Sequence, residues 1–337
     1  MTANPSTTLE AHALGAVLGA LAGDAAGAVL EFFGRDITDA DVRHALAMPG
    51  GGTWEVAPGQ VTDDGELTMS LLHALAEAPA RPTAAAAARY ARWVDSDPFD
   101  IGATTAASLG CLRRHEHAAQ AEEHGAARVM TVVAHARCSA SKANGSLMRA
   151  TPLAVWGAAR DVHVVTEATM ADARLSHPNP ACVGAAVAYV LAIRHLLRAP
   201  DDVAGAVAEA ERALAPAHFE EPRAWLAEAI AGMHVPYTPL DGFVRIAFTH
   251  AFRHLLAGTS WEDAIAETLR GGGDTDTNAC IVGGLLGARW GIDAVPPPML
   301  AAVEGSPTDA GVHPRPSELH PRDVRALVRC ILGDTTR

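Results

Sequence analysis

The sequence predicts an all-α fold: a single compact multi-helix domain over residues 9–335, preceded by a disordered N-terminal tail at 1–8. Apolar residues recur at the 3.6-residue spacing of helices, and few stretches show the alternation that is typical of strands. Hydrophobic residues make up 49% of the 337 residues and charged residues 19%, which indicates a globular protein with an ample core. Aromatic residues account for only 5%, whereas Ala and Gly abound, so closely packed helices are expected.

The first predicted helix spans residues 10–30 and carries glycines at four-residue steps from Gly15 to Gly27. Each interior glycine costs a helix about 0.5–1 kcal/mol relative to alanine, so this stripe needs a compensating contact. A second helix packed very close to it is the simplest one. A transmembrane dimer is the competing explanation, and Asp24 within the stripe argues against it. A similar stripe runs from Gly283 to Gly291, so we expect these two helices to be neighbours.

An acidic cluster begins the second predicted helix. Residues 48–60 form a loop by their Gly and Pro content, and Thr62, Asp63 and Asp64 then come directly before an amphipathic apolar pattern. Carboxylates and hydroxyls are common at a helix start because they cap its free N–H groups and complement its dipole. This cluster alone is therefore compatible with capping.

The middle of the chain is predicted to be a succession of helices joined by short loops. Residues 141–155 form a glycine-containing turn that runs into an apolar segment, and the segment SHPNP ends one helix. The expected helices are 83–94, one starting near 104, 116–137, 161–175, 181–197, two within 200–232, 243–256 and 261–269. The prolines at 296–298 are expected to end the last core helix, and a short helix follows at 324–332.

A second acidic cluster lies in the stretch GGGDTDTNACIVGGLLGARWG at 271–291. Three glycines give the backbone freedom to adopt positive φ or to approach another group closely. Asp274, Asp276 and Thr277 then belong to a run of five oxygen-bearing side chains, after which apolar residues follow at helical spacing. Two carboxylates with hydroxyls exceed what capping needs, and crowded hard oxygen donors suit Mg²⁺. A capped helix with a polar entrance remains the alternative.

The two acidic clusters lie about two hundred residues apart, so local capping cannot link them. If the fold brings both helix starts together, four carboxylates converge. Like charges at that separation need cations to coexist. We therefore predict one metal site made from both clusters.

Composition limits the partners and the compartment. The net charge of −13 argues against a broad nucleic-acid surface. The scattered cysteines contain no CxxC pair and are expected to be reduced. No signal peptide is evident and no apolar run is long enough to span a bilayer, so we expect a cytoplasmic protein without membrane association. The sequence does not decide the oligomeric state, for which a monomer is the default.

Six motifs occur in one order along the chain: GALAGDAAGAVLEF, TDDGELTMSL, DIGATT, NGSLMRATPL, SHPNPA and GGDTDTNACIVGGLLGA. Together they resemble the ADP-ribosylglycohydrolase family, which includes dinitrogen-reductase-activating glycohydrolases and ADP-ribosyl-acceptor hydrolases. The resemblance covers roughly residues 10–291, and TDD followed by GGDTDTN is its most specific part. It implies an all-α fold and two Mg²⁺ ions, with Mn²⁺ as the alternative ion, at the base of a cleft for ADP-ribose.

The resemblance also implies roles for individual residues. Glu31 matches the family glutamate near the metals and the reactive ribose, and Asp100 matches an acidic residue implicated in proton transfer. These two are the catalytic candidates. The implied metal ligands are Thr62, Asp63, Asp64, Asp274, Asp276 and Thr277, and the implied substrate-binding residues are Gly102, Asn144, Gly145, Ser146, Met148, Arg149 and His177.

Some of these residues have simpler interpretations. Arg149 could be a surface charge, His177 a helix C-terminal cap, and Asp24 a residue that orients the first helix. One departure concerns the first cluster, where many relatives read TDDT and this chain has Gly65 and then Glu66. The ligating positions are retained, and the missing hydroxyl affects the groups around them.

The resemblance implies an Mg²⁺-dependent hydrolase that cleaves the bond between ADP-ribose and an acceptor, foremost arginine on a protein, and releases ADP-ribose. The alternatives are another ADP-ribosyl linkage, to serine, a nucleic acid or a small metabolite, and a non-catalytic relative that binds ADP-ribose or serves a structural purpose. Loss of the acidic clusters would mark a non-catalytic relative, and here both clusters are intact.

Overall fold

The computed structural model describes residues 5–307 and 311–333, and this part of the chain contains helices and no β-strand, which confirms the predicted all-α class. The helices form one compact domain. Their bounds are α1 (Pro5–Gly27), α2 (Asp39–Leu46), α3 (Asp63–Glu77), α4 (Pro82–Asp95), α5 (Ala103–Leu109), α6 (His115–His124), α7 (Ala126–Cys138), α8 (Thr151–Trp156), α9 (Val162–Arg174), α10 (Pro180–Arg198), α11 (Val203–Ala213), α12 (Glu220–Ile230), α13 (Val244–Ala257), α14 (Trp261–Gly271), α15 (Thr275–Trp290), α16 (Pro297–Gly305) and α17 (Val324–Gly333).

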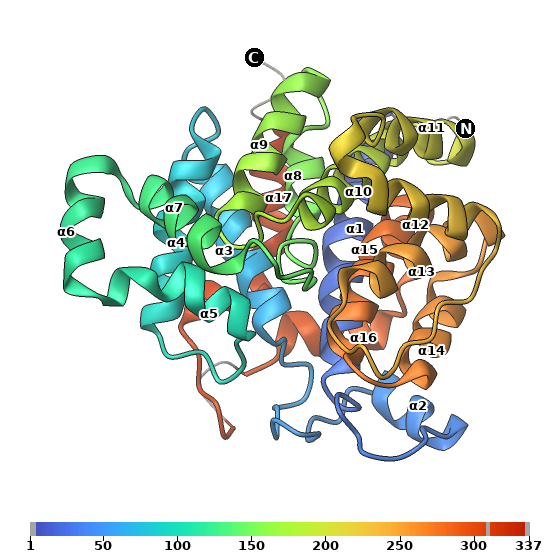
Figure 1. Ribbon diagram of the computed structural model, residues 1–337. Helices are drawn as coiled ribbons and strands as arrows, with labels where there is room; N and C mark the ends of the chain where they lie inside the picture. Colours follow the sequence, from blue (N-terminus) through green and yellow to red (C-terminus); the bar gives the residue numbers. More distant parts are fainter. Residues whose placement is uncertain (1–4, 308–310, 334–337) are drawn as a thin grey trace.

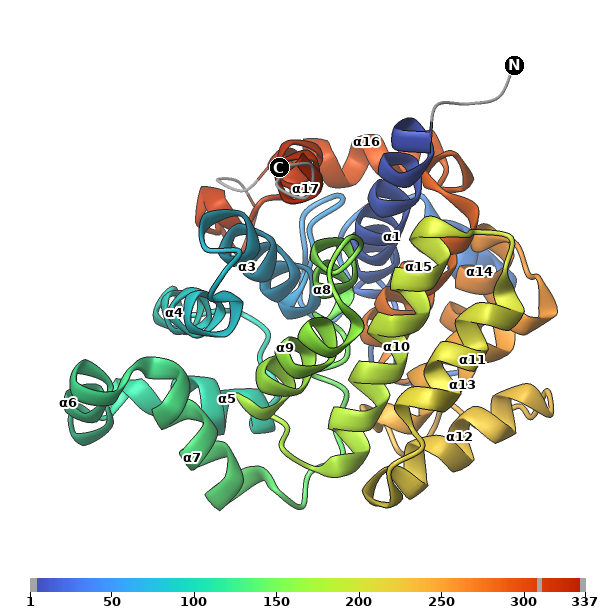
Figure 2. The ribbon, with the colours of Figure 1, turned by 90° about the horizontal axis from the view of Figure 1, so that it is seen from above.

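Helices α1 and α15 lie side by side at the centre of the domain (Figure 1). Figure 2 shows α3 and α4 on one side of this pair and α11 to α14 on the other. The buried core is continuous across these layers. Segments from the two ends of the chain therefore form the middle of the fold, and the intervening helices surround them.

The two glycine stripes face each other, as the sequence predicted. A Cβ added to Gly287 would lie 2.0 Å from the carbonyl oxygen of Gly15, and one added to Gly23 would lie 2.2 Å from that of Ala279. At the end of α1, a Cβ on Gly27 would lie 2.3 Å from the Cα of Asp276. Side chains at these positions would push the two backbones apart, so glycine sets the separation of α1 and α15.

The ends of α1 differ from the prediction. The helix begins at Pro5, so residues 5–8 are helical rather than part of a tail, and it ends at Gly27 instead of residue 30. Residues 1–4, with residues 334 and 335 at the other boundary, lie outside the described residues. The domain limits 9–335 thus stay a prediction.

Three other elements were not predicted as they occur. The pattern at 116–137 is two helices rather than one, because Gly125 adopts a φ of 87° between α6 and α7. Helix α2 was missed because it is short and mostly exposed. Helix α16 was missed because the prolines at 296–298 were interpreted as a stop, whereas proline also suits the first turn of a helix.

Helix α10 corrects the expectation that no apolar run is long enough to cross a membrane. It has 19 residues and a mean hydropathy of 1.6, so it passes that test by length and composition. However, 83% of its apolar window is buried inside the protein, as in the core helix of a globular domain.

We predict that Gly287→Ala destabilises the protein although alanine is the better helix former. The added methyl group would meet a backbone carbonyl at 2.0 Å, which can move only if α1 and α15 separate. We expect a loss of about 3 kcal/mol or more in the free energy of unfolding, measured by urea denaturation.

Gly305→Ala is the matched control, because nothing lies within 4 Å of a Cβ added there. It should leave the stability within about 1 kcal/mol of wild type. Equal stabilities for wild type and Gly287→Ala would contradict the close approach of the two helices.

Candidate active site

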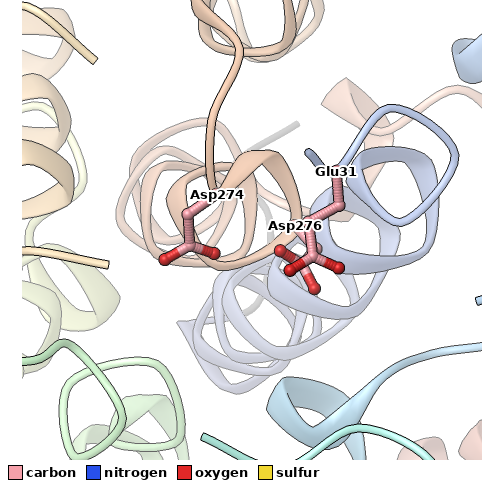
Figure 3. Close-up of side chains that lie close together, drawn as sticks. All are labelled: Glu31, Asp274 and Asp276. Atoms are coloured by element: carbon pink, nitrogen blue, oxygen red, sulfur yellow. The ribbon is translucent and has the colours of Figure 1, made fainter. Parts of the chain in front are cut away.

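The starts of α3 and α15 meet at the C-terminal end of α1, so the two acidic clusters come together as predicted. Thr62 Oγ1 lies 3.2 Å from Asp276 Oδ2, and Thr277 Oγ1 donates a hydrogen bond to Asp64 Oδ2 at 3.1 Å. Glu31 follows α1, and its carboxylate oxygen lies within 4.8 Å of oxygens of Asp274 and Asp276 (Figure 3). More than two hundred residues of intervening chain separate the partners in these contacts.

Capping does not account for the acidic clusters. The N-cap residues Thr62 of α3 and Asp274 of α15 make no side-chain cap hydrogen bond. Asp24 of α1 caps α3 instead, because its carboxylate accepts the backbone N–H of Thr62 at 3.1 Å and that of Gly65 at 2.8 Å. Asp24 thus fastens α1 to α3, which supports the orienting role considered for it from the sequence.

Burial and mutual repulsion oppose ionisation of the cluster. Burial, followed by the nearby carboxylates, raises the pKa values of Asp63, Asp64 and Asp276 well above their ordinary value. In the described part of the chain, the two fully buried ion pairs lie elsewhere and join Arg149 to Asp172 and Arg315 to Glu66. Among the described residues, no cationic side chain forms an ion pair with the carboxylates of the cluster.

The donor set of the cluster is made of oxygen atoms, which is the chemistry that hard divalent cations prefer. Asp64 is completely buried, and its Oδ1 has no hydrogen-bond partner among the described residues. A buried carboxylate oxygen without a partner is costly unless something else bonds to it. These residues fit a bound metal ion.

The two catalytic candidates also have raised pKa values. Burial, followed by repulsion from Asp100, raises the pKa of Glu31 to about 8. Burial, followed by repulsion from Asp274, raises the pKa of Asp100 to about 7. Both residues line the same cavity, so either one is able to hold a proton near neutral pH.

A cavity of about 430 Å³ opens onto the carboxylates. Asp63, Asp274, Asp276 and Thr277 line it, whereas Thr62 and Asp64 lie behind this layer. A larger hollow of about 830 Å³ lies between the start of α4 and α9, and its lining includes Trp156 and none of the cluster. We assign the chemistry to the smaller cavity because the carboxylates are there.

The predicted substrate-binding residues are only partly at the cavity. Those that line it are Gly102, Asn144, Gly145, Met148 and His177. Asn144 also donates a hydrogen bond from Nδ2 to Asp274 at 2.7 Å, so it links the two halves of the site. Ser146 is buried away from the cavity, and its hydroxyl has no partner among the described residues.

Arg149 is neither at the cavity nor at the surface. Its side chain is fully buried and pairs with Asp172, so the interpretation as a surface charge is wrong. It donates a hydrogen bond to the carbonyl oxygen of Gly145 at 2.7 Å. Arg149 therefore supports the wall of the cavity from behind.

Several further lining residues were missed from the sequence, and three of them have large or charged side chains. Trp54 donates a hydrogen bond from Nε1 to Glu31, while Phe32 and Asp241 form part of the rim. Trp54 and Asp241 lie in segments that were interpreted only as loops. The available signal was the tryptophan in the glycine-rich stretch GGGTWEV. A large aromatic side chain in such a loop often packs against a neighbouring segment or contributes to a binding site.

The departure at Gly65 has a structural reason. A Cβ at this position would lie 2.6 Å from Asp24 Oδ2, so glycine admits the carboxylate that caps α3. Glu66 accepts hydrogen bonds from Trp93 at 2.7 Å and from Arg315 at 2.7 Å. This pair ties α3 to the C-terminal segment.

The family model for ADP-ribosylglycohydrolase matches residues 5–327. The chain belongs to the ADP-ribosylglycohydrolase family. This membership confirms the predicted enzyme class, a hydrolase of glycosidic bonds.

Curated relatives are similar to this chain over most of their length. A putative ADP-ribosyl glycohydrolase of Acanthamoeba polyphaga mimivirus is 27% identical over 84% of this chain and 88% of its own. ADP-ribosyl-[dinitrogen reductase] glycohydrolase of Rhodospirillum rubrum is 27% identical over 87% of this chain and 90% of its own. ADP-ribosylarginine hydrolase Tri1 of Pseudomonas putida (strain GB-1) is 25% identical over 90% of this chain and 77% of its own.

A solved structure titled ADP-ribosylglycohydrolase-related protein complex has the same fold, with a TM-score of 0.72 at 22% identity. The match covers 98% of this chain and 100% of that one. The arrangement of helices around α1 and α15 is thus an arrangement found in a solved protein.

We predict that the metal-free enzyme loses stability as the pH rises from about 5 to about 8. Glu31, with a pKa raised to about 8, and Asp100, with a pKa raised to about 7, bind protons more tightly in the folded state than in the unfolded state. Such groups stabilise the fold below their unfolded pKa, and this contribution disappears as the pH passes through the folded pKa. Urea denaturation in EDTA measures the slope.

Asp276→Asn should flatten this slope because it removes one of the repelling carboxylates. Asp293→Asn, at an exposed position outside the cluster, is the control and should leave the slope unchanged. If the free energy of unfolding of wild type in EDTA is constant or rises between pH 5 and pH 8, the raised pKa values of these carboxyl groups are contradicted.

Proposed function

We propose that this enzyme is an Mg²⁺-dependent hydrolase that cleaves the N-glycosidic bond between ADP-ribose and an arginine side chain of a protein, releasing ADP-ribose. The observation that carries the proposal is a buried cluster of oxygen donors that opens to a cavity. Within the described part of the chain, this cluster has no ion-pair partner, and Oδ1 of Asp64 has no hydrogen-bond partner. A structural or purely ligand-binding protein would have little reason to maintain such an unfavourable cluster.

Two ions would be held between the starts of α3 and α15. Their ligands would be Thr62, Asp63, Asp64, Asp274, Asp276 and Thr277. Bound Mg²⁺ supplies positive charge that orients ribose hydroxyls and makes a water molecule more acidic. The short distance between Thr62 and Asp276 and the hydrogen bond from Thr277 to Asp64 support this assignment, because they place oxygen atoms from distant parts of the chain together.

The carboxyl groups of this chain would move the protons. The bond between the anomeric carbon and the acceptor nitrogen breaks, and the oxygen of water bonds to that carbon. One proton of the water passes to a carboxylate, and the leaving nitrogen receives a proton. Glu31 and Asp100 are suited to these steps because both line the cavity and have a raised pKa. The hydrogen bond from Trp54 holds Glu31 in position.

The charge distribution of the cavity suits an oxocarbenium-like transition state. Positive charge develops at the anomeric carbon as the bond breaks, and nearby anionic oxygens stabilise it. The diphosphate of ADP-ribose would instead lie against Gly145 and His177, which carry no negative charge.

Arginine on a protein is the proposed acceptor because the name of one relative contains the arginine linkage and the name of another contains a protein. The Pseudomonas relative is named for ADP-ribosylarginine and the Rhodospirillum relative for dinitrogen reductase, a protein substrate. Serine-linked and nucleic-acid-linked ADP-ribose are the competing substrates and serve as arms of the test below.

We predict that wild type releases ADP-ribose from ADP-ribosylarginine in Mg²⁺, stops in EDTA and recovers when Mg²⁺ is restored. Asp274→Asn should remain folded and lose at least about 100-fold in kcat/KM, because it removes a proposed ligand. Asp293→Asn should retain wild-type turnover. Chromatographic assay of released ADP-ribose measures all three proteins.

Full activity of wild type in EDTA, or of Asp274→Asn in Mg²⁺, would contradict the proposed metal dependence. Mg²⁺-dependent turnover of the serine-linked or nucleic-acid-linked substrate, with none of the arginine-linked one, would retain the metal site and replace the acceptor.

A further inference from the structure

A chain of buried hydrogen bonds runs beneath the wall of the cavity. Tyr90 donates from its hydroxyl to Asp172 Oδ1 at 2.8 Å, and Arg149 donates from Nε to Asp172 Oδ2 at 3.2 Å. The guanidinium of Arg149 also lies 4.9 Å from the centre of the Tyr90 ring. These three side chains are almost entirely excluded from solvent, so Arg149 is held in one orientation.

The other two nitrogens of Arg149 reach the residues that form the cavity wall. Nη1 donates to the carbonyl oxygen of Gly145 at 2.7 Å, and Nη2 donates to Ser176 Oγ at 2.9 Å. Ser176 Oγ lies 2.8 Å from Nδ1 of His177, which lines the cavity. Arg149 therefore contacts the imidazole only through the hydroxyl of Ser176.

The direction of these hydrogen bonds follows from the donor inventory. Arginine can only donate, so Ser176 Oγ accepts from Arg149 and retains its own proton. If His177 also donated from Nδ1, the buried hydroxyl of Ser176 would have no acceptor among the described residues. An unsatisfied buried donor is costly, so the hydroxyl donates to Nδ1 and the imidazole proton resides on Nε2.

His177 is also kept neutral. Burial, followed by the charge of Arg149, lowers the pKa of His177 to about 3. Nε2 has no partner among the described residues, although the side chain is 1% exposed. A Cβ at Gly145 would lie 3.1 Å from this nitrogen, so glycine leaves that edge of the ring uncovered.

We propose that Arg149 is a positioning residue: acting through Ser176, it holds His177 as the neutral tautomer with its proton on Nε2, so that this wall donates a hydrogen bond to an oxygen of the ligand. A phosphate or hydroxyl oxygen of ADP-ribose is the acceptor if the proposed function holds. The tautomer itself does not depend on that function. Arg149 thereby shapes the site without touching substrate.

The test is the protonation state of each His177 nitrogen in the free enzyme, measured by NMR of ¹⁵N-histidine-labelled protein at pH 7. The spectrum of His177→Gln identifies its signals. Wild type should hold at least about a tenfold excess of the Nε2–H tautomer. Ser176→Ala should reduce that excess by at least about threefold, because Nδ1 loses its donor. Arg149→Lys should reduce it too, because Ser176 Oγ becomes free to accept from Nδ1.

Ser70→Ala is the control, since this buried hydroxyl bonds only to the Glu66 carbonyl oxygen of its own helix. It should leave the His177 tautomer unchanged. If Arg149→Lys does not fold, Ser176→Ala decides the question, because it keeps the Arg149–Asp172 pair. A protonated Nδ1 in wild type, or an unaltered tautomer in Ser176→Ala, would overturn the inference. The predicted tautomer in an enzyme that does not bind ADP-ribose would refute the proposed function and leave this inference standing.

Discussion

The structure depends on the close approach of α1 and α15, which glycines on both helices make possible. The contact brings Gly27 against the backbone of Asp276, and the carboxylate of Glu31 consequently lies near those of Asp274 and Asp276. A larger side chain anywhere along this contact would separate the helices and pull the carboxylates apart. The packing of α1 against α15 therefore also sets the distances between the carboxylates of the site.

The cavity combines two kinds of wall. One is a cluster of buried carboxylates, in which burial and mutual repulsion oppose the ionised form. The other is neutral and is stiffened from behind by Arg149, whose charge is already paired with Asp172. Under the proposed function, the reacting sugar of ADP-ribose would lie at the carboxylates and its diphosphate at the neutral wall.

The sequence predicted the parts of the site that depend on local patterns. The glycine stripes are regular enough to predict a close helix contact, and the two similar acidic clusters predict a shared site. Arg149 could not be placed in this way, because its burial depends on Asp172 and Tyr90, which come from other helices. Trp54 was missed for a similar reason, since its partner Glu31 lies in another segment. Contacts between side chains from distant segments produce no periodic pattern in the sequence, so pattern analysis does not detect them.

The most direct test of the central claim is to count the ions that the two clusters hold together. Titration with Mn²⁺ followed by electron paramagnetic resonance reports free ion without requiring any substrate. We expect two ions per wild-type chain, and loss of tight binding both in Asp64→Asn, altered on α3, and in Asp276→Asn, altered on α15. Absence of binding in wild type, or unchanged binding when either helix is altered, would contradict a single site built from both ends of the chain.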